Sequence, residues 1–470
     1  MRQISTQSRE LGSVLSGKQL LKDEILQQFP SNELHYYLQK NFIELVPSIV
    51  KKKYTYSCNR CFNDQSYLFY EHPCTRCEKL CVYCRNCINM GKASTCNPIV
   101  KWIGPPVMPP ESPSEPILQW NGTLSKPQEK ASHLLARSVK TKTSTLVHAV
   151  CGAGKTEILF QAVEAALETG KRICIATPRR DVVQELFPRF QKAFPTTTIQ
   201  ALFGGSEHRN DGAHVTISTT HQLYRYQDAF DVMVIDEVDA FPNTADLTLQ
   251  RAAKNAQKPD GTLIFLTATP TQPILSQVKK GTLQSVKIPA RYHGCAVPEP
   301  KTKWIGDWKK AIEKNKVPYS LLQWLKPRIL AKKPVLLFLP DIPSMLKLEK
   351  LLTPYTPKIK SVHAKDPDRG KKVEEMRKKE INLLLTTTIL ERGVTFSNVD
   401  VAVLGAEKTI FTESALVQIA GRAGRDRNFP EGDVTFFHHG HTEAILKAQR
   451  HIQQMNREAR KAGLLKAEKA

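Results

Sequence analysis

The chain has 470 residues, enough for about three domains of ordinary size. Its 68 Lys and Arg residues outnumber 45 Asp and Glu residues, and the net charge of +23 favours a polyanionic partner, with nucleic acid first and an anionic membrane surface second. No apolar run approaches the roughly 18 residues that span a bilayer, so the composition excludes a membrane-spanning protein.

Residues 1–57 form an N-terminal segment without a recognisable motif, and it contains no apolar region of the kind that marks a secretory signal. We therefore expect a cytoplasmic protein. Residues 58–103 are a cysteine-rich block that holds eight of the eleven cysteines. In a reducing compartment such clustering indicates metal binding rather than disulfides, which predicts a small zinc-binding module.

The cysteine spacing is typical of a zinc ribbon. The first four cysteines form two Cys-x-x-Cys pairs separated by twelve residues, and a short hairpin at residues 65–70 is expected to join them. Four thiolates would close a tetrahedron around a structural Zn²⁺, and the last four cysteines could hold a second ion. The spacing leaves the pairing open, since Cys58 and Cys61 could instead join Cys84 and Cys87. The eight candidate ligands are Cys58, Cys61, Cys74, Cys77, Cys81, Cys84, Cys87 and Cys96.

A proline-rich linker at residues 104–116 precedes two series of short apolar runs that alternate with longer helical patterns. Such alternation predicts βαβ units and parallel sheets covered on both faces. The fold class is therefore α/β, with domains at residues 117–285 and 286–470 and a hinge within residues 279–300. The expected strands are Thr145–Val150, Arg172–Ala176, Val232–Ile235, Leu263–Leu266, Val335–Leu339, Ile381–Leu385, Val399–Leu404 and Val434–Phe437.

Residues 149–156 read Ala-Val-Cys-Gly-Ala-Gly-Lys-Thr, a P-loop variant between an apolar run and a helical pattern. Small residues let backbone N–H groups close around phosphate oxygens, while Lys155 reaches the β- and γ-phosphates and the Thr156 hydroxyl binds Mg²⁺. Ala149 replaces the usual first glycine. The loop predicts a site for ATP and Mg²⁺ formed by Gly152, Ala153, Gly154, Lys155 and Thr156.

Two further motifs complete the chemistry of ATP hydrolysis. An apolar strand ends in Asp236, which would hold Mg²⁺ through water, and Glu237, which would orient and deprotonate the attacking water. Arg422 and Arg425 stand three residues apart among glycines, an arrangement that suits charge developing on the γ-phosphate. Because these arginines lie in the second domain, we expect ATP to bind in the cleft between the domains.

The ordered motifs resemble those of the superfamily 2 helicases and translocases over residues 117–450. The resemblance implies two RecA-like domains, adenine recognition by Gln128, and a fifth motif at residues 385–394 whose Gly393 lies near the nucleotide. It also implies nucleic-acid contacts from the fifth motif and from two short motifs in the first domain. The contact residues would be Pro178, Arg179, Arg180, Thr219, Thr220, Thr387, Thr388 and Arg392.

The cysteine block, with the segment Cys84-Arg85-Asn86-Cys87-Ile88-Asn89-Met90-Gly91-Lys92, stands ahead of a compact two-domain motor. In this the chain resembles the ComFA family of late competence proteins over nearly its whole length. The resemblance implies a DNA-dependent ATPase that helps to bring single-stranded transforming DNA into the cytoplasm. It would work at the inner face of the membrane beside the uptake channel and a phosphoribosyltransferase-like partner, ComFC.

Two alternatives remain open. The replication-restart helicases of the PriA family are longer and carry their cysteines within the motor. The second alternative is a DNA-binding scaffold whose ATPase has lost its activity. The intact P-loop, acidic pair and arginines argue against such a loss. Residues 301–380 hold 21 Lys and Arg against 9 Asp and Glu, and this block predicts a surface that follows a phosphate backbone.

Overall fold

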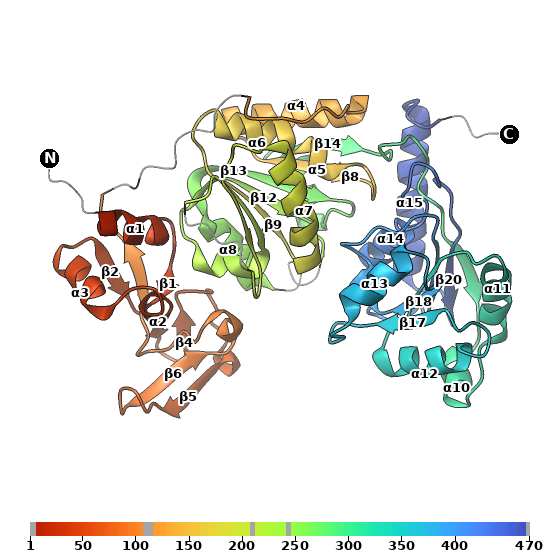
Figure 1. Ribbon diagram of the computed structural model, residues 1–470, viewed down its shortest axis with the longest axis horizontal. Helices are drawn as coiled ribbons and strands as arrows, with labels where there is room; N and C mark the ends of the chain where they lie inside the picture. The colour runs from red at the N-terminus through yellow and green to blue at the C-terminus, as the bar shows by residue number, and fades with distance from the viewer. Residues whose placement is uncertain (1–5, 106, 108–115, 207–211, 241–245, 467–470) are drawn as a thin grey trace.

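The computed structural model describes residues 6–105, 107, 116–206, 212–240 and 246–466. An N-terminal unit is followed by two α/β lobes, each built on its own sheet (Figure 1). The predicted class, two parallel-sheet domains in tandem behind a small cysteine-rich unit, is confirmed. Within the described residues, no helix combines the length and the apolar composition that a membrane span requires.

The N-terminal unit is built on a three-stranded antiparallel sheet. β7 (Ile99–Trp102), from the cysteine-rich block, lies between β1 (Leu20–Leu21) and β2 (Ile43–Val46). The structure therefore corrects the predicted boundary at residue 57, because residues from both sides of it share one sheet and one apolar core. Three helices accompany this sheet: α1 (Thr6–Leu15), α2 (Lys22–Leu26) and α3 (Ser31–Gln39).

The cysteine-rich part consists of two hairpins and short turns. One hairpin joins β3 (Ile49–Lys51) to β4 (Tyr56–Cys58), and the other joins β5 (Phe69–Pro73) to β6 (Leu80–Cys84). The hairpin expected at residues 65–70 lies instead at residues 69–84, because η1 (Ser66–Leu68) is a 3₁₀ turn. A second such turn, η2 (Ile88–Met90), follows β6.

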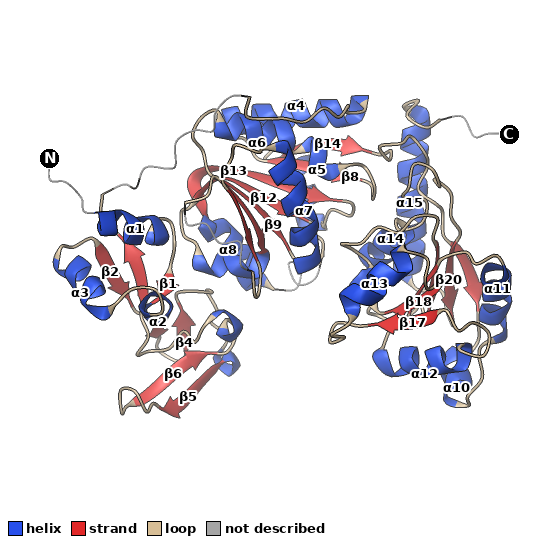
Figure 2. Ribbon diagram, viewed as in Figure 1, coloured by secondary structure: helices blue, strands red, loops and turns tan. Residues whose placement is uncertain are grey.

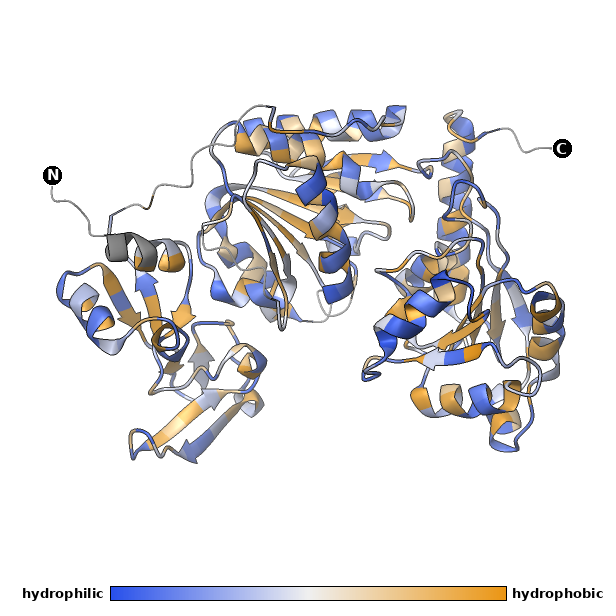
Figure 3. Cartoon of the chain, in the orientation of Figure 1, coloured by the Kyte–Doolittle hydropathy of each residue, from blue (hydrophilic) through white to orange (hydrophobic). Residues whose placement is uncertain are grey.

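Lobe 1, residues 117–288, contains a seven-stranded parallel sheet in the order β10-β11-β9-β12-β13-β8-β14. Its central strands are continuous apolar runs because helices cover both faces (Figures 2 and 3). In chain order the elements are α4 (Lys126–Thr141), β8 (Thr145–Ala149), α5 (Lys155–Ile158), α6 (Phe160–Leu167), β9 (Ile173–Thr177), α7 (Arg180–Ala193), β10 (Ile199–Leu202), β11 (Val215–Thr219), η3 (Thr220–Arg225), β12 (Phe230–Asp236), α8 (Leu247–Ala256), β13 (Gln257–Thr267), α9 (Gln272–Lys279) and β14 (Gln284–Ile288).

Lobe 2, residues 301–466, contains a six-stranded parallel sheet in the order β15-β20-β19-β16-β18-β17. In chain order the elements are β15 (Lys301–Trp304), α10 (Trp308–Glu313), α11 (Tyr319–Leu330), β16 (Val335–Phe338), α12 (Ile342–Leu352), β17 (Ile359–Val362), α13 (Arg369–Arg377), β18 (Leu383–Thr386), η4 (Thr388–Leu390), β19 (Asp400–Leu404), α14 (Glu413–Ala420), β20 (Val434–His438) and α15 (Glu443–Lys461).

The strands predicted from sequence are all present, with ends shifted by a few residues. The predicted boundary between residues 285 and 286 cuts β14, which pairs with β8 through Ile288, so the hinge is the linker at residues 289–300. Most of the predicted proline-rich linker, residues 106 and 108–115, lies outside the described part of the chain.

Candidate nucleotide site between the two lobes

The P-loop follows β8 and opens α5, as its sequence predicts. Gly152 and Gly154 have φ angles of +81° and +71°, which side chains other than glycine rarely adopt. A Cβ atom on Gly154 would lie 2.4 Å from Nε2 of Gln128, so a side chain there would displace the Gln128 amide. Lys155 and Thr156 form the first turn of α5, where backbone N–H groups have no intrahelical acceptor and are oriented for phosphate oxygens.

Gln128 links the start of α4 to the P-loop. Its side-chain oxygen accepts hydrogen bonds from the backbone N–H and the hydroxyl of Ser125, and its Nε2 donates to the carbonyl of Ala153 at 2.9 Å. Gln128 also lines a cavity that adjoins the P-loop, together with Trp120 and Tyr292. Adenine recognition by Gln128 stays a prediction, and this neighbouring cavity is where a base would fit.

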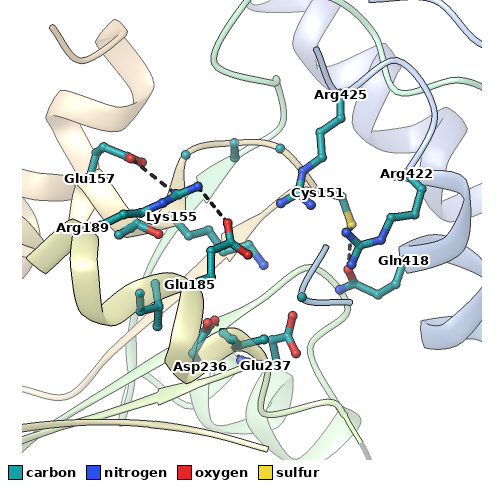
Figure 4. A pocket seen from close by; sticks show the side chains of 18 residues that line it. Cys151, Lys155, Glu157, Glu185, Arg189, Asp236, Glu237, Gln418, Arg422 and Arg425 are labelled. Carbon is teal, nitrogen blue, oxygen red and sulfur yellow. Dashed lines mark hydrogen bonds and ion pairs between the residues drawn. The ribbon is translucent and has the colours of Figure 1, made fainter. Parts of the chain in front are cut away.

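Asp236 and Glu237 face the P-loop from the end of β12 (Figure 4). Burial raises the pKa of Asp236 to about 7, the neighbouring Glu237 adds to the rise, and Lys155 and Arg392 oppose it. Glu237 adopts φ +54° at the turn after the strand, and its N–H donates to Oδ1 of Asp236. The Asp236 carboxylate and the Thr156 hydroxyl are oxygen ligands of the kind that suits Mg²⁺, and the Lys155 ammonium would contact phosphate oxygens instead.

The two arginines of lobe 2 have different surroundings. Arg422 is buried and donates to the backbone carbonyls of Glu391, at 2.7 and 2.9 Å, and of Val394. These hydrogen bonds stabilise the backbone of the fifth motif. Arg425 reaches the cleft opposite the P-loop (Figure 4) and forms no ion pair within the described residues. Both arginines line the cleft with the P-loop, and their catalytic roles stay a prediction. Because the guanidinium of Arg422 is engaged by backbone carbonyls, Arg425 is the stronger candidate for a phosphate contact.

Asp239, which the sequence analysis did not select, is the centre of a buried network. Its carboxylate accepts hydrogen bonds from the hydroxyls of Thr267, Thr269 and Ser414 and from Arg392 at 2.6 Å. Burial opposes ionisation of Asp239, but Arg392 and the hydroxyls outweigh it and lower its pKa. The Thr-Ala-Thr segment that begins at the last residue of β13 and the second acidic residue after β12 were the signals, and both are weak in isolation.

Two arginines that were predicted to contact nucleic acid lie between the lobes, where Arg392 is buried and Arg179 is partly buried. Arg392 is 1% exposed and lies 3.4 Å from Glu237 and 2.6 Å from Asp239. Arg179 bonds to Glu391 at 2.6 Å and to the carbonyls of residues 388 and 389. Both side chains cross the cleft and pair with acidic or carbonyl oxygens, so they couple the lobes rather than present a surface to a strand.

The other predicted nucleic-acid residues gather at one edge of the two sheets. β9 and β11 are neighbours, so Thr177 and Thr219 are partners in register and their two motifs lie side by side. Arg180 is exposed there, whereas Thr219 and Thr220 are buried and Pro178, Thr387 and Thr388 are partly buried. Gly393, with φ +76°, lines the cleft that contains the P-loop, and its contact with a nucleotide stays a prediction.

The eight cysteines of the N-terminal unit form two groups of four, in each of which the sulfur atoms lie within 4.8 Å of one another. One group is Cys58, Cys61, Cys84 and Cys87, and the other is Cys74, Cys77, Cys81 and Cys96. The alternative pairing is therefore the one found, and the ribbon pairing of the first four cysteines is corrected. The cause is the β5–β6 hairpin, which carries residues 74 and 77 away from residues 58 and 61.

Both groups have the geometry of a tetrahedral thiolate site. Sulfur atoms are 3.9 Å apart for Cys58 and Cys87 and 3.6 Å apart for Cys61 and Cys84. In the second group the corresponding separations, between residues 74 and 96 and between 77 and 81, are 3.7 and 3.3 Å. Four Zn–S bonds of about 2.3 Å imply separations of roughly 3.8 Å, so the residues present fit Zn²⁺.

The first cysteine group borders lobe 1. Asn86, between two of the ligands, donates to Thr248 at 3.0 Å and to the sulfur of Cys61 at 3.6 Å. The four sulfurs share an apolar cluster with residues of η3 and α8, including Leu223 and Tyr224. Because η3 begins directly after Thr219, this group is packed against the segment that carries a predicted nucleic-acid motif.

Three family models match consecutive parts of the chain. Residues 5–101 match the competence protein ComFA N-terminal domain, residues 121–272 the type III restriction enzyme res subunit, and residues 316–427 the helicase conserved C-terminal domain. The first match falls on the N-terminal unit, and the other two fall within lobe 1 and lobe 2, respectively.

Similar proteins cover most of the chain. Competence protein ComFA of Bacillus subtilis (strain 168) is 44% identical over 97% of this chain and 97% of its own length. The protein of the same name from Streptococcus pneumoniae (strain ATCC BAA-255 / R6) is 37% identical over 92% and 97%, respectively. Replication restart protein PriA of Rickettsia felis is 27% identical, but the match covers 46% of this chain and 35% of that protein.

Solved helicase structures share the fold of the two lobes. Saccharomyces cerevisiae Dbp5 bound to RNA and ADP BeF3 superposes with a TM-score of 0.51 at 14% identity, over 71% of this chain and 91% of that one. RecG bound to a three-way DNA junction gives a TM-score of 0.50 at 17% identity, over 71% and 45%. At these identities the likeness concerns the fold alone.

Proposed function

The chain belongs to the ComFA family of competence proteins, and from this premise we propose that it is an ATP-driven motor that moves along single-stranded DNA during DNA uptake. Its helicase-type lobes support an ATPase of superfamily 2. Coupling of hydrolysis to movement on DNA is the part that is proposed.

The nucleotide cleft carries the proposal. One lobe contributes the P-loop and the acidic pair, and the other contributes Arg425, so hydrolysis and closure of the lobes depend on each other. Lys155 and Thr156 would hold the phosphates and Mg²⁺ with Asp236, and Glu237, which lines the same cleft, would orient a water. The bound ion would neutralise charge that develops on the phosphate oxygens.

Replacing Arg425 by alanine should lower kcat for ATP hydrolysis by about 10- to 100-fold, since a hydrogen bond to a charged group is worth about 1.5–3 kcal/mol. Arg189 is the matched control: it lines the same cleft but is already paired with Glu185 at 2.7 Å and Glu157 at 3.7 Å. Arg189→Ala should therefore change kcat much less. Steady-state phosphate release measures both, and equal effects would remove the special role of Arg425.

We place the DNA strand along the edge where the motif ends of the two lobes meet. Arg179 reaches the carbonyl of Thr388 across the cleft, so motifs from both lobes lie near each other there. In the basic block at residues 301–380, some cations are engaged internally, as in the ion pair of Lys360 with Glu375. Other cations of α13 and the turn after it are exposed, among them Lys371 and Lys378.

Single-stranded DNA should stimulate ATP hydrolysis by the full chain, and its affinity should fall steeply with salt. If about five phosphates are neutralised, affinity will drop roughly 10²-fold between 50 and 200 mM salt. Phosphate release with single-stranded DNA, duplex DNA and no DNA tests the first expectation, and fluorescence anisotropy of a labelled oligonucleotide tests the second. Hydrolysis that is indifferent to DNA would contradict translocation, and a flat salt response would contradict the basic surface.

We also propose that the chain works at the inner face of the membrane, beside the uptake channel and with a phosphoribosyltransferase-like ComFC partner. Membership of the ComFA family supports this placement. The cysteine-rich hairpin β5–β6 and the turn η1 before it leave Tyr67, Tyr70 and Leu80 exposed, so the N-terminal unit retains surface for a partner after docking on lobe 1.

A further inference from the structure

Arg291 lies in the linker between β14 and β15 and is buried, with 2% of its surface exposed. Its guanidinium donates to the backbone carbonyl of Gly421, at 3.2 Å, and to that of Gly424. Its Nε has no hydrogen-bond partner, and within the described residues the side chain forms no ion pair. A buried cation that bonds only to carbonyls is costly, which calls for an explanation.

The two acceptors belong to the turn that carries Arg425. Gly421 is the C-cap of α14, where a cation interacts favourably with the unpaired carbonyls and the helix dipole. Gly424 adopts φ +60°, and a Cβ atom there would lie 2.1 Å from the carbonyl oxygen of Pro430 and 3.1 Å from Nη1 of Arg291. The turn is therefore packed too tightly for any side chain, with the guanidinium as one wall.

The other side of Arg291 touches the P-loop. The N–H of Tyr292 donates to the carbonyl of Gly152 at 3.1 Å, and a Cβ atom on Gly152 would lie 3.6 Å from Cγ of Arg291. The P-loop and α14 also meet directly, because the thiol of Cys151 donates to Oε1 of Gln418 at 3.0 Å. The linker thus contacts both walls of the nucleotide cleft through two successive residues.

Three arginines gather around this cleft without a carboxylate partner within the described residues: Arg291, Arg422 and Arg425. Burial, together with the charge of Arg425, lowers the pKa of Arg291 to about 10 and that of Arg422 to about 9. This excess of positive charge would be compensated by the phosphates of a nucleotide, which explains why it is tolerated.

We infer that Arg291 is a positioning residue that holds the turn of Arg425 against the P-loop and so couples closure around the nucleotide to the interlobe linker. Its backbone acceptors in lobe 2 and the contact of Tyr292 with the P-loop make the linker part of the closed site. The inference rests on the proposed ATPase. It adds a set of contacts through which the nucleotide bound in the cleft affects the linker between the lobes.

Arg291→Met keeps the apolar stem and removes the guanidinium. We expect kcat for ATP hydrolysis to fall about 10-fold or more, with KM and the affinity for a fluorescent ATP analogue changed less than about threefold. Hydrogen exchange should show that a transition-state analogue, ADP with aluminium fluoride, protects residues 289–300 in the wild-type chain and fails to do so in the variant. Lys287→Met is the matched control, because Lys287 also contacts lobe 2, through Glu458 at 2.7 Å, but from an exposed position.

Thermal unfolding and a second variant, Arg291→Lys, separate positioning from folding. Lysine keeps the charge but lacks the planar fork with which arginine donates to the two carbonyls from separate nitrogen atoms, so the variant should fold and still lose most of the protection of the linker. Wild-type kcat and protection in either variant, or the same loss in Lys287→Met, would overturn the inference. Absence of ATP hydrolysis in the wild-type chain would instead overturn the proposed function.

Discussion

Lys155→Ala should reduce ATP hydrolysis by about 10³-fold, because it removes a preorganised cation that would contact the β- and γ-phosphates as charge develops. Lys155 begins α5 and lines the cleft with Asp236, whereas Arg189, another cation of lobe 1 in that cleft, is already paired with Glu185. We therefore expect no compensation from Arg189. Phosphate release under saturating single-stranded DNA measures the loss.

The same variant should bind single-stranded DNA nearly as well as the wild-type chain, since the proposed DNA surface lies outside the P-loop. Lys280→Ala is a suitable control, because it removes an exposed lysine of the same lobe that follows α9. Anisotropy of a labelled oligonucleotide checks the binding of both variants. ATP turnover that survives in Lys155→Ala would refute the assignment of the nucleotide site.

Cys84→Ser should unfold the N-terminal unit and destabilise lobe 1 with it. A structural zinc site contributes about 10–16 kcal/mol in small domains, which matches or exceeds the stability of about 5–15 kcal/mol of a typical domain. Cys84 is fully buried, and its cluster shares apolar contacts with η3 and α8 of lobe 1. Elemental analysis should find one zinc ion per chain fewer than in the wild type, and the melting temperature of the whole chain should fall.

Cys77→Ser in the second group provides the comparison. Its cluster lies at the partly exposed end of the β5–β6 hairpin, away from the motor core, so the variant should also lose one ion but keep the melting temperature of the lobes. A chain that contains no zinc when purified without chelators would refute both sites. Equal destabilisation by the two variants would contradict the special role of the group that borders lobe 1.

Local sequence was enough for the parts of the site that depend on consecutive residues. The P-loop glycines are required by positive φ angles, and the acidic pair follows directly from the apolar run that forms β12. Both groups were therefore found at the predicted positions. The roles of Arg392 and Arg179 were not predictable in the same way. Their motifs place them at strand ends near nucleic acid in the family, whereas their partners, Asp239 and Glu391, come from the opposite lobe.

The cysteines show the same limit. Spacing identified eight thiols as metal ligands but left their pairing open, because the choice depends on how a hairpin folds back. Only the β5–β6 pairing separates residues 74 and 77 from residues 58 and 61. The segment at residues 1–57 likewise carried no motif, and its place in the sheet follows from the pairing of β1 and β2 with β7, some 50 to 80 residues away in sequence.

By itself, the sequence determined the α/β class, the order of the units, the P-loop with its acidic pair, and a net charge of +23 that favours a polyanion. These follow from periodicity, composition and short motifs, which local backbone physics controls. The tertiary structure decided which of the two arginines is engaged by backbone carbonyls, which cysteines share a site, and that Arg291 joins the linker to the cleft. Those features require contacts between residues distant in the chain, and such contacts are set by packing of the whole fold rather than by any local pattern.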